Sequence, residues 1–326
     1  MAMTRGIVAI GGSLGAVDAA RQLCRDLPAD LPASVLIVLH VGTRGNDLLA
    51  GIFDEGSAIT VTTAAENEVL RCGHVYVAPA DRHLLVIDGR IRLGRGPREN
   101  MTRPAIDPLF RSVAMSCGPR AIGVVLSGLL NDGAAGLADI KRCGGVTVVQ
   151  NPRDAVAPDM PLGALGATDV DYRTQLSDLA ELLVRLVHEE AGPAVPIPSD
   201  IPGEVEIALG RAVDPARLAR FAAPVALSCP ACGGVLSQVE RWPPLRFRCQ
   251  VGHAYTAEAL AEQKEVSVDE AIRVALRIME ERALLTGKIA DDAHRSGRKA
   301  VAALYAKRLR ESKGYADILR QAIERA

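Results

Sequence analysis

Three residues of the types that build hydrolytic triads, Ser13, His40 and Asp132, are the candidates for catalysis in this chain. A serine hydroxyl is a weak nucleophile until a base takes its proton. Histidine has an unperturbed pKa of about 6.5, which suits that task near neutral pH. A carboxylate bound to the other imidazole nitrogen fixes the tautomer and stabilises the imidazolium. These residue types together favour acyl transfer through a serine nucleophile.

The segments before these residues explain how side chains so far apart in the sequence could meet. Each residue follows an apolar segment typical of a buried parallel strand, and the segments span residues 7–10, 34–39 and 121–126. In an open parallel sheet, ligands bind outside the carboxyl ends of the strands. We therefore expect the three side chains to converge at one edge of the sheet.

Ser13 lies at the centre of a glycine-rich corner with the pattern G-x-S-x-G, from Gly11 to Gly15. Glycine tolerates the strained dihedrals and the close packing of a sharp turn from strand to helix. Backbone amides at the start of the following helix would form a natural oxyanion hole. We therefore assign Gly12 and Leu14, the two neighbours of Ser13, to the predicted oxyanion and substrate pocket.

Each of these residues also has a structural interpretation. The motif is short and occurs by chance, a histidine at a strand end is more often structural, and Asp132 could serve a turn or a helix cap. A dinucleotide site is a further rival, because a glycine corner can also cradle a pyrophosphate. However, Ser13 stands where that motif needs glycine, and His40 stands where it needs an acidic residue. The joint placement of the three residues favours hydrolysis.

The alternation of strand-like and helix-like segments over residues 1–190 predicts an α/β domain. We expect a doubly wound, largely parallel sheet with helices on both faces. Residues 191–225 are interpreted as a linker, and no helix is expected in its proline-rich start, which runs to Gly203. A compact cysteine-bearing unit follows at residues 226–262. Residues 263–326 predict a tail of two helices that could pair as an antiparallel hairpin.

The composition limits the partners and the location. The chain has 326 residues, a formal net charge of -1 and only 3% aromatic residues. These values give no electrostatic or stacking argument for nucleic acid or an anionic membrane as the main partner. No segment is apolar for long enough to span a bilayer, and the apolar start fits a first strand better than a signal peptide. We therefore expect a cytoplasmic protein without membrane insertion.

Cys229, Cys232, Cys249 and His253 form a C-x2-C pair and a C-x3-H pair, which is ligand spacing for tetrahedral zinc. Four protein ligands would make a closed, structural site, so we expect no cofactor in catalysis. A unit of this size has too small a hydrophobic core to fold without a further cross-link such as a bound metal, so zinc would contribute to folding. The alternative is two pairs of buried thiols.

The residues between the two pairs do not form the basic stripe of a nucleic-acid-binding zinc unit. Arg246 and Arg248 alone are weak evidence for nucleic-acid binding. A protein partner for the tail is the favoured interpretation.

Five motifs in this order resemble the catalytic domain of the chemotaxis methylesterase CheB over about residues 5–190. They are IGGSLG, LIVLH, VYVAPADRHL, RPAIDPLFRSVA and LSGLLNDGAAGL. The resemblance implies hydrolysis of glutamate methyl esters, and deamidation of glutamines, on chemoreceptor signalling helices. It also implies that Ser13 is the nucleophile, His40 the base and Asp132 its orienting partner.

The chain departs from the family pattern around the predicted pocket. Leu14 and Ala16 stand where the family has threonine and glycine, and Leu129 and Leu130 replace methionine and glycine. The rim of the pocket, Leu129 included, therefore differs, and the substrate could differ with it. The family's N-terminal receiver domain is not expected here, whereas the tail is similar to that of some receiver-less members.

Other interpretations stay open. His83, in the PADRHL segment, either lines the pocket or is structural. A non-catalytic signalling adaptor, which would use the hydrolase fold and the tail to bind a partner, is the main functional alternative. An esterase or amidase with a small-molecule substrate is the third.

Overall fold

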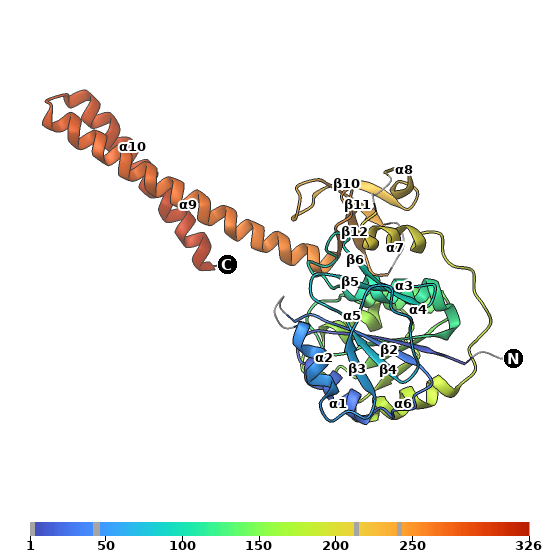
Figure 1. The fold of residues 1–326 in the computed structure, drawn as a ribbon. Coiled ribbons are helices and arrows are strands. Elements are labelled where there is room, and N and C mark those ends of the chain that lie inside the picture. Colours follow the sequence, from blue (N-terminus) through green and yellow to red (C-terminus); the bar gives the residue numbers. More distant parts are fainter. Residues whose placement is uncertain (1–3, 42–45, 212–214, 240–242, 326) are drawn as a thin grey trace. The chain divides into compact units, whose positions relative to one another are not determined.

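The structure is a computed structural model that describes residues 4–41, 46–211, 215–239 and 243–325. The chain divides into two compact units, Met1–Leu260 and Ala261–Ala326. The first contains the central sheet, its helices and a small second sheet, and the second is helical (Figure 1). Each unit is described by itself below.

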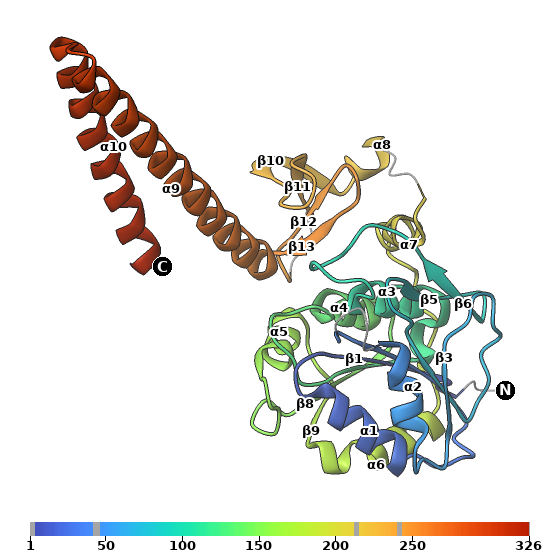
Figure 2. The same cartoon turned by 60° about the vertical axis from the view of Figure 1, so that its left-hand side comes forward.

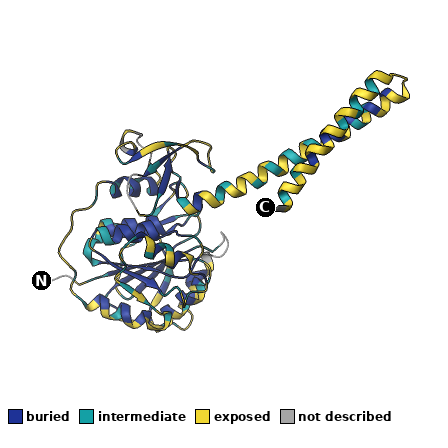
Figure 3. Ribbon diagram, turned by 180° about the vertical axis from the view of Figure 1, so that it is seen from behind, coloured by how far each residue is buried: buried dark blue, intermediate teal, exposed yellow. Residues whose placement is uncertain are grey.

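The first unit is built on a parallel sheet with the strand order β3-β4-β2-β1-β7-β8-β9. All ladders between these neighbours are parallel. The central strands are apolar on both faces and fully buried, as in the run from Ser34 to Leu39 (Figure 3), because helices cover both sides of the sheet. The strands are β1 (Ile7–Gly12), β2 (Ser34–Leu39), β3 (Thr60–Thr63), β4 (His74–Val77), β7 (Ala121–Val125), β8 (Val146–Gln150) and β9 (Tyr172–Thr174).

The chain order across this sheet reverses between β1 and β7. From β1 the chain moves outward through β2 to the edge strand β3 and then places β4 between β3 and β2. It returns to place β7 beside β1 and moves outward on the other side through β8 to β9. Open sheets of this kind bind ligands at the carboxyl ends of the strands where the order reverses. The predicted α/β fold with a large parallel sheet is therefore confirmed.

Helices cover the two faces of the sheet and enclose one apolar core on each side. One face carries α1 (Ala16–Asp26), α2 (Asn46–Asp54) and α6 (Leu176–His188). The other carries α3 (Ile106–Cys117), α4 (Ala134–Arg142) and α5 (Asp159–Ala167). Strands β5 (His83–Ile87) and β6 (Arg90–Gly94) form a hairpin that packs beside α3 and turns at Asp88-Gly89.

The expectation that the proline-rich segment up to Gly203 holds no helix is wrong. Helix α7 (Ile201–Leu209) begins within it, with Pro202 in its first turn and Gly210 at its end in the left-handed conformation. Proline is tolerated in a first turn because the amide it lacks has no partner inside the helix. The predicted linker 191–225 also contains α8 (Pro215–Leu218) and the start of β10.

Helix α7 is held by buried charge. Glu204 Oε2 lies 2.9 Å from Arg111 Nη2, 3.0 Å from Arg246 Nη1 and 3.1 Å from Arg248 Nη2. Burial opposes ionisation of Glu204, but these arginines hold the pKa of its carboxyl far below the usual range. Arg111, Arg246, Arg248, Glu99, Glu204 and Asp139 together form what we call the buried charge cluster.

The remainder of the first unit is an antiparallel sheet with the order β10-β11-β12-β13, called the small sheet below (Figure 2). Its strands are β10 (Ala222–Ser228), β11 (Val235–Val239), β12 (Arg246–Cys249) and β13 (Ala254–Thr256). Leu236, Phe247 and Tyr255 are buried in its own small core. This sheet corresponds to the cysteine-bearing unit predicted at 226–262.

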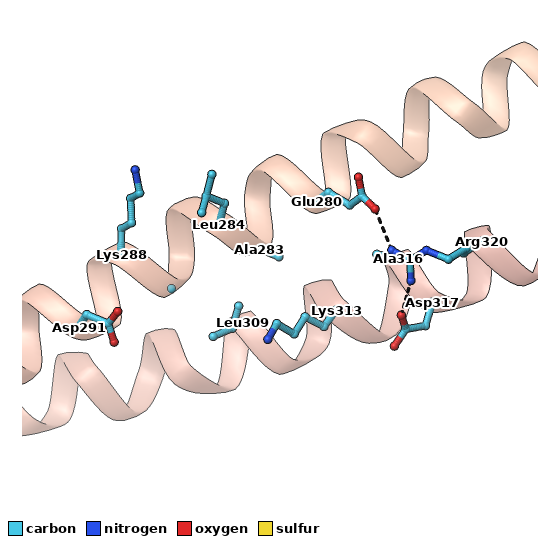
Figure 4. A pocket seen from close by; sticks show the side chains of 11 residues that line it. Glu280, Ala283, Leu284, Lys288, Asp291, Leu309, Lys313, Ala316, Asp317 and Arg320 are labelled. Atoms are coloured by element: carbon cyan, nitrogen blue, oxygen red, sulfur yellow. Dashed lines mark hydrogen bonds and ion pairs between the residues drawn. The ribbon is translucent and has the colours of Figure 1, made fainter.

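The helical unit is formed by α9 (Ala257–Arg295) and α10 (Lys299–Arg325), which run antiparallel as a hairpin. Gly297 adopts the left-handed conformation in the short turn between the two helices. An open groove of about 560 Å³ lies between the helices and is crossed by an ion pair from Arg320 to Glu280 (Figure 4). In the described part of the chain, no helix combines the length and apolarity needed to cross a membrane.

The contact between α3 and α4 depends on a glycine. A Cβ added at Gly136 would lie 2.6 Å from Phe110 Cβ and 2.9 Å from the backbone oxygen of Asp107. We predict that Gly136→Ala lowers the free energy of unfolding by about 1–3 kcal/mol, because the two helices must move apart. Thermal unfolding measures the change.

Gly166→Ala is the matched control. Gly166 lies in helix α5, and a Cβ there would meet nothing within 4 Å. This substitution should leave stability unchanged or raise it by up to about 1 kcal/mol. Equal unfolding temperatures for the two variants would contradict the proposed helix contact.

Candidate active site

Ser13 follows the last residue of β1, at a corner that only small residues can form. A Cβ at Gly12 would lie 2.4 Å from Ala16 Cβ, and one at Gly15 would lie 2.6 Å from Val156 Cβ. Gly15 has a φ of 80° and caps helix α1. The glycines therefore let the chain turn directly from strand to helix and leave Ser13 partly exposed at the turn.

His40 lies beside this corner because β1 and β2 are neighbours in register. Gly12 pairs with Leu39, and the His40 amide donates to the Gly12 oxygen at 3.1 Å. Ser13 and His40 therefore each follow the last residue of a strand, and the two strands are neighbours in the sheet. The strand ends predicted this placement.

Asp132 completes the group from the loop between β7 and α4. Its Oδ2 lies 2.9 Å from His40 Nε2 and accepts a hydrogen bond from the Ile106 amide at 2.7 Å. Its Oδ1 accepts hydrogen bonds from Asn100 Nδ2 at 2.8 Å and from the Asp107 amide at 3.3 Å. The first turn of α3 thus directs amides at this carboxylate, which favours its negative charge.

Asp132 is ionised although it is buried. Burial raises the pKa of its carboxyl, but the hydrogen bond and charge of His40 and the hydrogen bonds from Ile106 and Asn100 more than offset it, so the pKa lies below the usual value. Burial and the charge of Asp132 instead raise the pKa of the adjacent Asp107 to about 8. Asp107 is therefore largely protonated at neutral pH, and the negative charge of this carboxyl pair rests on Asp132.

The tautomer of His40 follows from its two neighbours. Thr102 Oγ1 lies 3.2 Å from His40 Nε2 and donates its own proton to the Glu99 oxygen. Thr102 and Asp132 therefore both face Nε2 as acceptors, so Nε2 carries the proton of the neutral ring. Nδ1 is then the ring nitrogen that could accept a proton, whereas in chymotrypsin-type triads the carboxylate holds Nδ1 and Nε2 is the base.

Within the described residues, neither the Ser13 hydroxyl nor His40 Nδ1 makes a hydrogen bond. Catalytic hydrogen bonds of this kind are often long without substrate and tighten only in the complex. The arrangement is that of a nucleophile beside a base whose far nitrogen is already held by a carboxylate.

The amides around Ser13 have different roles. The Ser13 amide donates to the Ser127 oxygen at 2.9 Å, which ties the corner to the end of β7. The amides of Leu14 and Gly15 donate no hydrogen bond to any part of the chain that the structure describes. They are therefore the amides next to Ser13 that could bind a developing oxyanion.

The predicted pocket residues separate into two groups. Leu14 and Leu129 each have 53% of their surface exposed, and a Cβ at Gly128, the residue before Leu129, would lie 2.9 Å from Ser13 Cβ. These exposed leucines therefore flank the serine. Gly12 is buried beneath the corner, where it allows close packing and its oxygen accepts the hydrogen bond from the His40 amide.

His83 is fully buried, and the structure does not support its assignment to the pocket rim. Its Nε2 lies 2.9 Å from the Pro97 oxygen, and its Nδ1 accepts a hydrogen bond from the Ala105 amide. Burial lowers the pKa of its imidazole. Of the two interpretations, this placement favours the structural one, in which neutral His83 supports the segment before α3.

Sequence reasoning missed Asn100 and Thr102, which contact Asp132 and His40 directly. Neither residue belongs to a strand end or a glycine-rich corner. The Glu99–Thr102 turn, which carries both, is closed by hydrogen bonds between the backbones of Glu99 and Thr102. No local pattern in this stretch signals that the turn lies against the triad residues.

A second candidate site lies in the small sheet. Cys229, Cys232, Cys249 and His253 bring their ligand atoms within 4.8 Å of one another. The separations from His253 Nδ1 are 3.8 Å to Cys229 Sγ and 3.5 Å to Cys249 Sγ, and the Cys232 and Cys249 sulfurs are 3.7 Å apart. Tetrahedral zinc with bonds of about 2.0–2.3 Å places its ligand atoms roughly 3.5–3.8 Å apart. The donor set therefore fits a zinc ion.

The backbone around these side chains has the form of two tight turns. The Gly233 amide donates to the Cys229 oxygen, and the Gly252 amide donates to the Cys249 oxygen. Gly233 and Gly252 have φ values of 72° and 106°, which favour glycine. The turns present each ligand pair to a common point.

Comparison with known proteins gives matches over the first part of the chain. The sequence model of the CheB methylesterase family matches residues 8–183. A Leptospira interrogans protein named putative protein-glutamate methylesterase/protein-glutamine glutaminase is 38% identical over 180 residues, which cover 55% of this chain and 93% of the relative. A Yersinia pestis protein-glutamate methylesterase/protein-glutamine glutaminase is 37% identical over 182 residues, which cover 55% of this chain and 52% of the relative.

A solved structure is similar as well. The crystal structure of the CheB methylesterase catalytic domain from Thermotoga maritima matches with a TM-score of 0.54 and 29% sequence identity. The match covers 57% of this chain and 100% of that one. The small sheet and the helical unit lie outside the residues matched by the family model.

The geometry predicts that Ser13 reacts with a serine-directed fluorophosphonate. Mass spectrometry should place the adduct on Ser13, because His40 Nδ1 can take its proton. Labelling should disappear in Ser13→Ala and fall strongly in His40→Ala.

Ser177→Ala is the control, because Ser177 is an exposed serine of helix α6. It should be labelled like the wild type. A wild-type chain that stays unlabelled would argue for the non-catalytic adaptor.

Proposed function

Because the chain belongs to the CheB methylesterase family, we propose that it is a serine hydrolase that removes methyl groups from glutamate methyl esters on chemoreceptor-type signalling helices. We also propose that it deamidates glutamines there. The observation that carries the proposal is the 2.9 Å contact between His40 Nε2 and Asp132 Oδ2 at the strand end beside Ser13. It leaves Nδ1 as the base for the serine.

The proposed reaction starts with attack of Ser13 Oγ on the ester carbonyl carbon, while the serine proton passes to His40 Nδ1. Asp132 stabilises the imidazolium through Nε2–H. The amides of Leu14 and Gly15 donate to the oxyanion of the tetrahedral intermediate. The bond from the carbonyl carbon to the methoxy oxygen then breaks, and methanol leaves with the proton from Nδ1.

The second half regenerates the serine. Water loses a proton to His40 Nδ1 and attacks the acyl carbon, and the bond to Ser13 Oγ breaks as the serine takes that proton back. The product is the free glutamate side chain. With glutamine as the substrate, ammonia leaves in place of methanol and the remaining steps are the same.

The surface around Ser13 fits a protein substrate better than a small polar ester. Leu14, Leu129 and Val156 expose 53%, 53% and 75% of their surface. Exposed apolar side chains around a reactive group can dock the apolar positions of a helix while the ester reaches the serine. Leu14 and Leu129 are also two of the residues at which the chain departs from the family pattern.

We propose that Cys229, Cys232, Cys249 and His253 hold one structural zinc ion. The ligand separations and the paired glycine turns support it. Four protein ligands leave no open coordination position, so the metal would stabilise the small sheet and would take no part in the hydrolysis.

Methanol release from a chemoreceptor signalling domain methylated on its glutamates tests the proposed activity. Ser13→Ala should abolish release. Asp132→Asn should lower kcat by up to about 10⁴-fold, because the His40 tautomer is no longer fixed. Ser177→Ala should match the wild type.

Two outcomes would contradict the activity. Full release in Ser13→Ala would exclude the proposed nucleophile. A wild type that is labelled by fluorophosphonate but releases no methanol from the receptor would favour a small-molecule ester as the substrate.

Metal analysis of the full chain tests the zinc proposal. The expected content is close to one zinc per chain, falling to near zero in Cys232→Ser. Cys72→Ser is the matched control, because Cys72 is also an exposed, free cysteine but lies outside the cluster. A metal-free chain in which the small sheet is still folded would refute the proposal.

A further inference from the structure

The Glu99–Thr102 turn contacts the triad residues on one side and the small sheet on the other. On the first side, Asn100 Nδ2 donates to Asp132 Oδ1, and Thr102 Oγ1 faces His40 Nε2. Two residues of one turn, separated only by Met101, thus reach two of the three proposed catalytic side chains. The position of this turn therefore sets how the carboxylate and the imidazole are held.

On the other side, the turn is bound by strand β13. The Asn100 amide donates to the Ala254 oxygen at 2.8 Å, and the Thr256 amide donates to Asn100 Oδ1 at 2.8 Å. Met101 packs against the core of the small sheet. The side-chain amide of Asn100 is therefore held by β13 through its oxygen, while its nitrogen donates to Asp132 Oδ1 at 2.8 Å and to Asp107 Oδ2 at 3.1 Å.

The backbone of the turn needs such support. Asn100 and Met101 have φ values of 47° and 66°, and two consecutive non-glycine residues in the left-handed region cost free energy. Conformations of this kind persist only where surrounding contacts fix them. Here those contacts come from β13 and from the core of the small sheet.

A second connection reaches Asp132 from the neighbouring residue. Thr256 Oγ1 donates to Asn131 Oδ1, and Asn131 Nδ2 donates to Glu258 Oε2 at 2.6 Å. Asn131 directly precedes Asp132, is buried, and is followed by the start of α4. The end of β13 and the start of α9 therefore hold the loop that carries the catalytic carboxylate.

The buried charge cluster fixes the small sheet in this place. Arg248 Nη2 lies 2.9 Å from Glu99 Oε1, and both side chains are almost fully buried. Glu99 opens the same turn, so the arginine of β12 anchors the turn at a further point. Removing one partner would leave a buried charge unpaired, which is strongly unfavourable.

We propose that the small sheet is an integral part of the catalytic site, in which β13 positions Asp132 through Asn100 and through the hydrogen bond from Thr256 to Asn131. Asn100 and Thr256 are positioning residues for the hydrolysis proposed above. They act on the orientation of the carboxylate and do not contact the substrate. This proposal rests on the proposed function only where kcat is measured, because that measurement needs the proposed hydrolysis.

Thr256→Val and Asn100→Asp test the two connections in the full chain. Thr256→Val removes the hydroxyl and keeps the side-chain shape. Asn100→Asp keeps the oxygen that faces Thr256 and tolerates the left-handed backbone, but removes the donor to Asp132. Each should lower kcat for methanol release by about 10- to 100-fold with KM unchanged, because a misplaced catalytic group slows the chemical step.

Matched controls separate positioning from general damage. Thr286→Val removes another buried threonine hydroxyl, in α9, and Asn67→Asp changes another asparagine with a φ of 65°. Both should keep the wild-type kcat. Thr256→Ser retains the hydroxyl and should restore the activity that Thr256→Val loses.

A second readout does not depend on the substrate. In protein with isotope-labelled histidine, the Nε2–H proton of His40 should give a hydrogen-bonded NMR signal in the wild type and in both controls. That signal should shift or broaden in Asn100→Asp and Thr256→Val. If the wild type releases no methanol, the proposed function fails, and the NMR comparison still tests the positioning.

The proposal is overturned if Asn100→Asp and Thr256→Val keep both the wild-type kcat and the wild-type His40 signal. It is also overturned if Thr286→Val and Asn67→Asp lose as much activity as the two test variants. In either case, the small sheet would be a neighbour of the active site without a role in it.

Discussion

The buried carboxylate of Asp132 is the constraint on which the rest of the site depends. A charge that is taken out of water is costly unless it is surrounded by donors, and here the donors come from elements far apart in the sequence. His40, the first turn of α3 and Asn100 all bind the two oxygens of Asp132. Satisfying this one group brings the end of β2, the start of α3 and the Glu99–Thr102 turn to a single point.

The buried charge cluster likewise joins elements that are far apart in the sequence, because each buried charge in it needs a partner of opposite sign. Arg111 of α3 contacts Glu99, Asp139 and Glu204, and Arg246 and Arg248 of β12 join it from the small sheet. A buried ion pair is not a strong source of stability in itself, but it is highly specific, because an unmatched partner is costly. The cluster therefore fixes where α7 and β12 lie against α3 more than it adds to the free energy of folding.

The sequence allowed the sheet, its main helices and the Ser13, His40 and Asp132 group to be predicted because each depends on a local pattern. Ser13, for example, lies on a glycine corner at the end of an apolar strand. Helix α7 was missed because the proline-rich segment up to Gly203 was taken to exclude a helix, although Pro202 lies in the first turn. Arg246 and Arg248 were considered only as weak evidence for nucleic-acid binding, but their partners Glu99 and Glu204 lie more than forty residues away. No hydrophobic periodicity or residue spacing in the sequence indicates ion pairs between residues so far apart.

Buried contacts cross the boundary between the family domain and the remainder of the chain. The match to the family ends at residue 183, yet Glu99 and Arg111 find their buried counter-charges in α7 and β12. A chain cut at the end of the family match would keep these two residues and lose Glu204 and Arg248. It would also uncover Met101 and the strained backbone of Asn100. The family match therefore ends inside one compact unit, whose buried ion pairs join residues on both sides of that end.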